Sequence, residues 1–367
     1  MDALLKKCHD FYAPEAIVFI NDEKVTKHGI GIVELKIEQS LSGANSFSFT
    51  VANALDYEYN LNKKYTDLLQ FGNKVEIKIG YRSEYKSIIT GVITSISWNF
   101  TEENYLDVEV EGYDYLFLLT KGKSNKAPWK NRKDSDIVKD IVQQTKYNVI
   151  KHIHIDNTET DCSYRRQEKS ESDYDFIVNH LAKKNGYEVF VEGEDFYFRK
   201  PPAKESSAFS MKYGEELLTF NPQFNLAQQV SRVEVYGWDP SSKRKIIGKA
   251  GSSKTGASGK KEATGSSKIK LLLKDDVVYK VRVPVCSQKE ADQLALSLFQ
   301  KRANLLVTGS ATSIGIPDLK PGIFVELKNL GKRFSCNYYV DKVTHGFADG
   351  AYKMNFNIRG NTYHEST

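Results

Sequence analysis

The run Pro-Gly-Ile-Phe-Val-Glu-Leu-Lys at 321–328 opens the stretch of sequence, ending at Gly360, that decides the fold. It continues as Tyr-Tyr-Val-Asp-Lys-Val-Thr-His-Gly-Phe at 338–347 and as Tyr-Lys-Met-Asn-Phe-Asn-Ile-Arg-Gly at 352–360. Apolar and polar residues alternate in each run, which is the period of a strand with one buried face. Turn-forming residues separate the runs, so we predict an antiparallel meander.

The same pattern occurs a second time nearer the N-terminus. Gly72 to Lys78 matches Gly322 to Lys328 at the glycine, valine, glutamate and lysine positions. Val92 to Phe100 then aligns with Tyr339 to Phe347, which pairs the two phenylalanines. The two copies are too far apart for a solenoid and predict two related β-domains in one chain. In the third run the alignment places Leu106, Val108, Val110 and Gly112 opposite Met354, Phe356, Ile358 and Gly360.

Composition excludes several classes of protein. A chain of 367 residues is long enough for two or three domains. The net charge of +5, from 52 basic and 47 acidic residues, is too nearly balanced to indicate a nucleic-acid-binding protein. Four scattered cysteines suit a reducing cytosol, and the N-terminus lacks the apolar core of a signal peptide. We therefore expect cytoplasmic synthesis and no membrane partner in the resting state.

The expected fold class is mainly β with an α+β insert. Helices in the insert are indicated by apolar stripes with candidate caps at Asp134 or Ser135 and at Ser172. A further capping residue, Ser287, precedes a helix predicted over 287–302. The predicted domains are a first tube-like β-barrel over 1–119, the α+β insert over 120–213, and a second β-barrel over 214–367 with a Gly/Ser/Lys loop at 250–268.

Four stretches, in this order, carry a resemblance to a known family. The first runs from Ser170 to Tyr187, the second from Val233 to Pro240, the third from Gly309 to Gly322, and the fourth from Tyr338 to His345. Together they resemble the late control protein D family of phage tail hubs and the hub portion of VgrG. The motif positions that carry the resemblance are Glu171, Asp173, Phe176, Gly186, Gly237, Trp238, Pro321, Gly322, Tyr339 and His345, with Gly72 in the first copy.

The resemblance implies a structural role and a defined assembly. Members of that family form homotrimers in which two tube-like barrels per chain make a pseudo-hexameric ring. Such a ring joins a sixfold tail tube to a threefold spike, so the implied partners are other copies of the chain, a tail tube protein and other baseplate proteins. Spike-bearing members continue beyond this region, which leads us to expect a separate spike protein. The implied location is a bacterial phage tail, a tailocin or another contractile injection particle.

Residues with catalytic or metal-binding potential have simpler structural explanations. His152 and His154 share a strand face, but the only additional ligand in prospect is the distant Cys162. Adjacent acids such as Glu102-Glu103 and Asp275-Asp276 would face opposite sides of a strand. We therefore expect no enzyme activity, cofactor or metal. A cell-wall-degrading baseplate enzyme and a carbohydrate- or receptor-binding β-protein are the alternatives.

Basic residues are concentrated between Lys243 and Lys274, where ten lysines and arginines accompany one acid, Glu262. A solvated loop is the favoured interpretation, by about two to one, over contact with a polyanion. Nucleic acid is not an expected partner, because no helix-turn-helix or zinc motif is present. The loop residues that would contact a polyanion are Lys249, Lys254, Lys260, Lys261 and Lys268.

Overall fold

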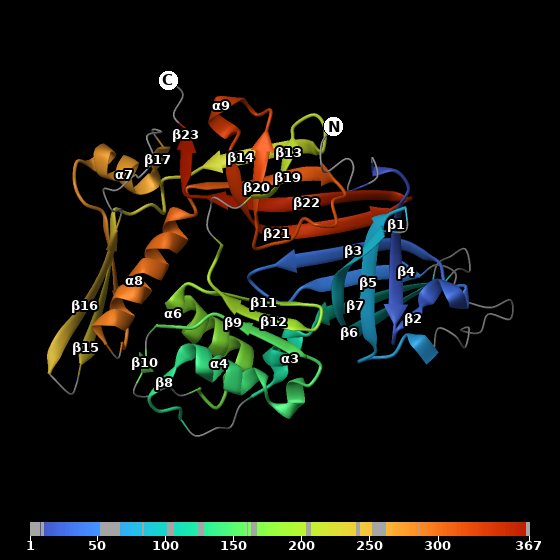
Figure 1. Ribbon diagram of the computed structural model, residues 1–367, viewed down its shortest axis with the longest axis horizontal. Coiled ribbons are helices and arrows are strands. Elements are labelled where there is room, and N and C mark those ends of the chain that lie inside the picture. Colours follow the sequence, from blue (N-terminus) through green and yellow to red (C-terminus); the bar gives the residue numbers. More distant parts are fainter. Residues whose placement is uncertain are drawn as a thin grey trace.

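The computed structural model describes residues 8, 11–51, 67–82, 84–100, 106–123, 128–159, 161–162, 167–202, 207–239, 243–251, 262–285 and 287–364. The chain is mostly β, as expected, and its main feature is a curled, half-barrel sheet of 13 described strands. Figure 1 shows the α+β insert below this sheet and a smaller unit of strands and one long helix beside it.

The N-terminal part of the large sheet follows the expected alternation. In β4, for example, Phe47, Phe49 and Val51 are buried on one face while the residues between them are half-exposed. Antiparallel pairing gives the order β3-β4-β7-β6-β5-β1-β2. The strands are β1 (Pro14–Ile20), β2 (Glu23–Lys24), β3 (Ile32–Ser40), β4 (Ser46–Val51), β5 (Lys74–Tyr81), β6 (Glu84–Phe100) and β7 (Leu106–Asp114), with the 3-10 turn η2 (Val25–His28) after β2.

The C-terminal part repeats this arrangement. The predicted meander is present as three antiparallel strands in the order β20-β21-β22, with the short helix α9 between the first two. On its other side β22 pairs antiparallel with β19, and β19 pairs antiparallel with β14. β13 pairs in parallel with β20. The elements are β13 (Ser207–Lys212), β14 (Leu217–Phe224), β19 (Val307–Ile314), β20 (Phe324–Lys328), α9 (Gly331–Phe334), β21 (Asn337–Ala348) and β22 (Ala351–Gly360).

Matching β-bulges show that the two parts share one topology. The order β3-β4-β7-β6-β5 corresponds to β14-β19-β22-β21-β20. Thr94 is the extra residue of β6 against β7, and Asp341 is the extra residue of β21 against β22. Val33 is the extra residue of β3 against β4, and Leu218 is the extra residue of β14 against β19. Because a bulge is a specific irregularity of a strand pair, its recurrence fixes which residues of the two parts are equivalent.

One detail of the predicted repeat is wrong. Leu106 pairs with Phe100, whereas Tyr352 pairs with Phe347. The equivalent of Leu106 is therefore Tyr352 and not Met354, which shifts the alignment of the third strands by two residues. Because side chains on a strand repeat every two residues, this shift leaves the buried face unchanged and the sequence pattern does not detect it.

The two parts form one continuous sheet over a shared core. β3 of the first part pairs antiparallel with β21 of the second, from Ser40 opposite Lys342 to Glu34 opposite Ala348. A single hydrophobic cluster includes buried residues of both parts, such as Ile37 and Val343. The closure of each part into a separate barrel remains a prediction.

The insert packs its helices on a three-stranded sheet around a second core. Trp129 stacks on Phe176 within it, at a centroid distance of 5.6 Å. Its first described helix, α3, directly follows β7. Its elements are α3 (Leu116–Lys121), β8 (Arg132–Lys133), α4 (Asp134–Val142), η3 (Thr145–Tyr147), β9 (His152–Ile155), β10 (Asp161–Cys162), α5 (Asp173–Asp175), the π-helical η4 (Phe176–Ala182), α6 (Lys183–Asn185), β11 (Glu188–Glu192) and β12 (Asp195–Arg199).

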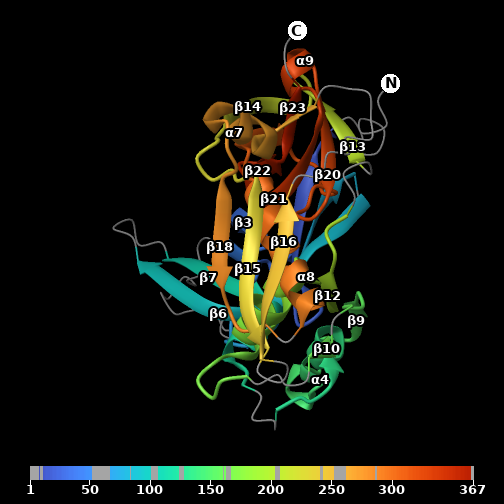
Figure 2. The ribbon, with the colours of Figure 1, turned by 90° about the vertical axis from the view of Figure 1, so that its left-hand side faces the viewer.

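The third unit consists of a small sheet covered by α8 (Gln288–Ala303). In Figure 2 its strands stand side by side at the front of the view, next to that helix. Helix α8 matches the predicted helix, and the Ser287 side chain accepts a hydrogen bond from the Glu290 amide as a cap. The strands are β15 (Arg232–Asp239), β16 (Arg244–Gly251) and β18 (Val278–Arg282), and β17 (Glu262–Thr264) lies beyond them, paired with β23 (Thr362–His364).

Two local predictions are corrected. Part of the loop predicted over 250–268 is ordered as β17 and the start of α7 (Gly265–Leu273), which the Thr264 side chain caps. The pairing of β17 with the distant β23 supplies order that the local composition does not reveal. Residues 252–261 lie outside the described residues. Neither Asp134 nor Ser135 caps α4, because the distant Thr158 hydroxyl accepts the hydrogen bond from the Ser135 amide at 3.1 Å.

Candidate assembly surface

The junction between β3 and β21 shows how one half of the chain binds the other. His345 of β21 is fully buried there. Its ring nitrogens contact the Tyr352 hydroxyl at 2.7 Å and the Gln39 side-chain oxygen, from β3, at 3.2 Å. Burial lowers the pKa of His345 to about 3, so the ring is neutral at physiological pH. The junction is therefore a buried, hydrogen-bonded contact between the two halves.

Strand β14 has one free edge among the described strands. It is the last strand of the sheet path and pairs only with β19. The amide of the following residue, Asn225, donates to the Leu306 carbonyl at 2.9 Å. Backbone groups alternate in direction along a strand, so Pro222 has its ring nitrogen on the opposite, unpaired edge. A proline at that position removes no hydrogen bond from the existing ladder, which is typical of an edge strand.

The C-terminal half of β6 is a second free edge. β5 pairs with β6 only as far as Val92, and beyond the Thr94 bulge the described strands supply β7 alone as a partner. Figure 2 shows β6 and β7 extending away from the body of the molecule. Trp98 is 41% exposed and Phe100 is 72% exposed. Large aromatic residues at a free strand edge are typical of a contact surface.

The predicted motif glycines begin equivalent strands. Gly72 has a φ of +83° and Gly322, which follows Pro321, has a φ of +85°, values that glycine adopts without strain. The amide of Gly72 donates to the Ile93 carbonyl, and that of Gly322 donates to the Val340 carbonyl, both at 2.9 Å. These residues set the turn that starts the meander in each half.

The motif helix is held by a buried acid. Asp173 is completely buried, and its carboxylate accepts hydrogen bonds from Lys146 Nζ at 2.6 Å and from the Tyr147 hydroxyl at 2.5 Å. Glu171 lies at the helix entrance, 2.8 Å from the His180 ring, and Ser172 caps the first turn. Gly186 ends the helix in the left-handed conformation. Sequence pattern predicted the cap and the stop but not the buried partners of Asp173.

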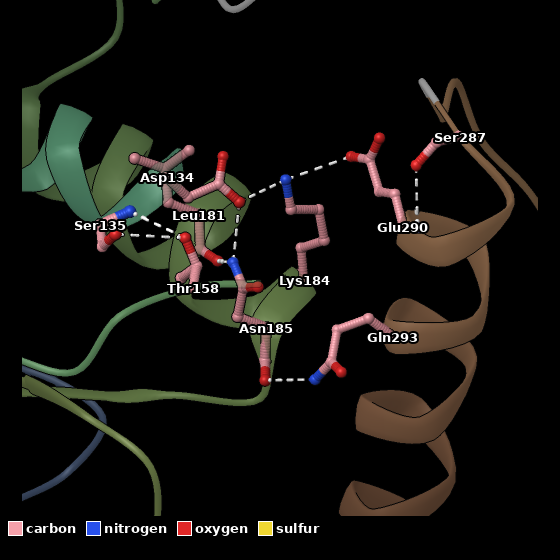
Figure 3. A network of polar contacts seen from close by, with 9 residues as sticks. All are labelled: Asp134, Ser135, Thr158, Leu181, Lys184, Asn185, Ser287, Glu290 and Gln293. Atoms are coloured by element: carbon pink, nitrogen blue, oxygen red, sulfur yellow. Dashed lines mark hydrogen bonds and ion pairs between the residues drawn. The ribbon is translucent and has the colours of Figure 1, made fainter. Parts of the chain in front are cut away.

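A buried polar network joins the insert to α8, as Figure 3 shows. Lys184 Nζ contacts the Asp134 carboxylate and lies 3.2 Å from Glu290 Oε1, and all three side chains are at least nine-tenths buried. Asn185 also donates to Asp134, at 2.8 Å, and its carbonyl accepts from Gln293 of α8 at 2.9 Å. These contacts fix the insert against the third unit.

A second polar cluster joins the insert to the meander. Glu188 of β11 is 7% exposed and accepts a hydrogen bond from the Tyr339 hydroxyl. Arg199 and Arg359 lie 3.6 and 3.4 Å from its carboxylate oxygens. Burial raises the pKa of Glu188, and the hydroxyl and the arginines partly offset that rise. Arg199 also donates to the Gly322 carbonyl at 2.8 Å, which ties the insert to the turn before β20.

The remaining predicted positions lie in the third unit and do not converge with the others. Gly237 is in β15, where a side chain would meet Val285, and the adjacent Trp238 is 53% exposed. Lys249 is in β16, and Lys268 is on α7. Lys254, Lys260 and Lys261 lie outside the described residues. The structure therefore leaves the polyanion contact as a prediction.

The histidines considered as metal ligands do not converge with other ligands among the described residues. His152 and His154 lie on one exposed strand face, and His154 stacks on Tyr197 at 4.7 Å. Within the described part of the chain no group of three or more histidine, cysteine and acidic side chains is placed to hold a metal ion. Over the same residues, no helix is long and apolar enough to cross a membrane.

Comparison with known proteins identifies a family and a fold. The family described as the Alg8 N-terminal domain matches residues 15–349. No curated protein matches the chain. This family match does not test the resemblance to the late control protein D and VgrG hubs, which stays a prediction.

Solved structures with a similar fold include two tail proteins and a component of the type VI secretion system. A tail protein from Neisseria meningitidis is 12% identical with a TM-score of 0.69, and the match covers 95% of this chain and 97% of that one. The 43 kDa tail protein of a Shewanella oneidensis prophage is 13% identical with a TM-score of 0.69, over 94% and 98% of the two chains. An Escherichia coli protein described as a component of the type VI secretion system is 14% identical with a TM-score of 0.52, over 92% and 76%.

Proposed function

The chain belongs to the Alg8 N-terminal domain family, and because its fold is that of phage tail proteins we propose that it is a structural hub subunit of a tail-like particle. Three copies form a ring in which six related half-sheets surround an axis. The ring binds a sixfold tail tube on one side and a threefold spike on the other. In this proposal the subunit is related to the late control protein D and VgrG hubs and carries no enzyme activity.

The observation that carries the proposal is the duplicated sheet. Two halves with the same strand order and the same two bulges are joined through β3 and β21 within one chain. A protein with two similar halves presents six similar faces when three copies associate, which adapts a threefold partner to a sixfold one. The Glu188 cluster holds the insert against this sheet, and the Lys184 network holds the insert against α8, which gives the subunit the rigidity that such a ring needs.

Mass measurement in solution tests the proposal. We expect light scattering of the purified chain to give a trimer at micromolar concentration, and we expect the trimer to bind the tail tube protein of the same particle. A chain that stays monomeric at every concentration contradicts the hub. Lysis of cell wall by the purified protein in a zymogram, lost on replacing an acidic pair, would instead support the enzymatic alternative.

A further inference from the structure

The geometry points to a second copy of this chain as the partner of both free strand edges. We propose that β14 of one copy pairs antiparallel with the C-terminal half of β6 of the next copy, in the register that β3 and β21 use within the chain. This interface deepens the proposed ring and rests on it for the number of copies. The residue pairing itself follows from the β-bulges alone.

The bulges fix the register. Trp98 is four residues beyond the Thr94 bulge, as His345 is four residues beyond the Asp341 bulge. Ile37 and Pro222 are likewise both four residues beyond their bulges, at Val33 and Leu218. Within the chain, His345 lies opposite Ile37. Between copies, Trp98 therefore lies opposite Pro222, and positions 95–100 of β6 lie opposite positions 225–220.

The chemistry of the resulting pairs is matched on both faces. One face joins apolar residues, and the other joins short polar residues, although the register was derived without reference to side-chain type. Cross-strand neighbours of like character stabilise a sheet, and a slip of one residue would oppose apolar residues to polar ones throughout. The apolar pairs are Ile96 with Phe224, Trp98 with Pro222 and Phe100 with Phe220, and the polar pairs are Ser95 with Asn225, Ser97 with Gln223 and Asn99 with Asn221.

Apolar side chains at the two free edges are more exposed than their equivalents at the internal junction, as the proposal requires. Val343 and His345 of β21, which β3 covers, are 0% exposed. Their equivalents in β6 are Ile96, which is half-buried, and Trp98, which is 41% exposed. On the other strand, Leu35 is 1% exposed, whereas its equivalent Phe220 is half-buried. The apolar face of each edge therefore continues the shared core up to the last of the described strands.

The two edges differ from each other, so the contact is head-to-tail. Such a contact repeats from copy to copy and generates a ring or a filament instead of an isolated pair. Pro222 lacks an amide hydrogen on its outward edge, which removes one donor from the ladder and leaves its carbonyl available. That missing donor weakens the ladder that any strand added at this edge could form, so the apolar pairs must supply much of the stability of the proposed interface.

Disulfide cross-linking of the full chain tests the register. Ser97 and Gln223 oppose each other as a non-hydrogen-bonded pair, because the backbone groups of Gln223 point toward β19, and their Cα atoms should lie about 4.5 Å apart. We expect the S97C/Q223C protein to form covalent oligomers under mild oxidation, which S97C and Q223C alone do not form. Mass spectrometry should find one linked peptide pair carrying positions 97 and 223.

A register-shifted control and a charge variant complete the test. N99C/Q223C is two residues out of register and should cross-link at least tenfold less, because its Cα atoms lie beyond disulfide reach. Trp98→Lys should leave the circular dichroism spectrum unchanged and yield monomers. Equal cross-linking of both double variants, or none in a protein that light scattering shows to be trimeric, overturns the pairing while sparing the hub. Specific cross-links in ladders that extend beyond three chains uphold the pairing and overturn the trimeric hub.

Discussion

Replacing Lys184 by methionine should destabilise the protein strongly, because it removes the cation from a buried pair of carboxylates. Methionine keeps most of the aliphatic stem, so the loss is that of the charge. Lys184 Nζ contacts Asp134 and lies 3.2 Å from Glu290, side chains that are 0% and 2% exposed. Breaking a buried ion pair on one side costs about 3–5 kcal/mol, since the two buried carboxylates lose the cation between them.

A matched control is available nearby. Lys289 on α8 lies 3.7 Å from Glu159, but both side chains are more than 60% exposed. Lys289→Met should therefore cost at most about 1 kcal/mol. The two variants make the same substitution, yet the different burial of the two lysines predicts losses in unfolding free energy that differ severalfold.

Hydrogen exchange measures the outcome locally. We expect Lys184→Met to increase the exchange of amides in α4 and α8, which the network joins, far more than Lys289→Met does. If the two variants give equal exchange in α4, the network does not hold the insert in place and this reasoning is refuted.

Three further predictions concern the sheet. In urea unfolding, Gly72→Ala should cost about 1–2 kcal/mol because of its positive φ, and Gly322→Ala should cost more because a Cβ would lie 2.6 Å from Arg199. Burial raises the pKa of Asp114 to about 7, so its contribution to stability should fall, by up to about 4 kcal/mol, as pH rises from 4 to 7, and the difference between wild type and Asp114→Asn in thermal melts should follow that slope. Burial lowers the pKa of His345 to about 3, so its contribution to stability should fall as pH drops below 6.5, and the difference between wild type and His345→Gln should follow that opposite slope. Because the two contributions oppose each other between pH 4 and 6.5, each is measured against its own variant, and a reversed slope in either difference would contradict the stated pKa shift.

The sequence predicted the features whose signals are local. Gly72 and Gly322 were found because a turn with positive φ demands glycine in each copy. Ser172 and Ser287 were found because a capping side chain lies within three residues of the amide that it accepts from. The alternation of apolar residues likewise predicted the meander, because a strand with one buried face shows this alternation within its own sequence.

Features that depend on distant partners were missed. The cap of α4 comes from Thr158, 23 residues after the amide that it binds. Lys184 and Glu290 look like ordinary surface charges in sequence, because nothing near either one shows that both are buried. β14 was not predicted as a strand, since an edge strand with a proline and half-exposed apolar residues has weak alternation. The free edges of β14 and β6 thus depend on the strand pairing of the whole sheet, which the local sequence does not show.

The two halves are alike near the junction and different away from it, and this contrast explains how one ring could serve two symmetries. β3, β4, β7 and β6 correspond to β14, β19, β22 and β21 down to their bulges. Outside them, β5 pairs antiparallel with β1, whereas β20 pairs in parallel with β13. The insert and the α8 unit occur once per chain. In the proposed trimer the continuous wall would therefore be nearly sixfold, whereas the periphery would be strictly threefold. A tube would meet the first surface and a spike the second, without either partner having to break its own symmetry.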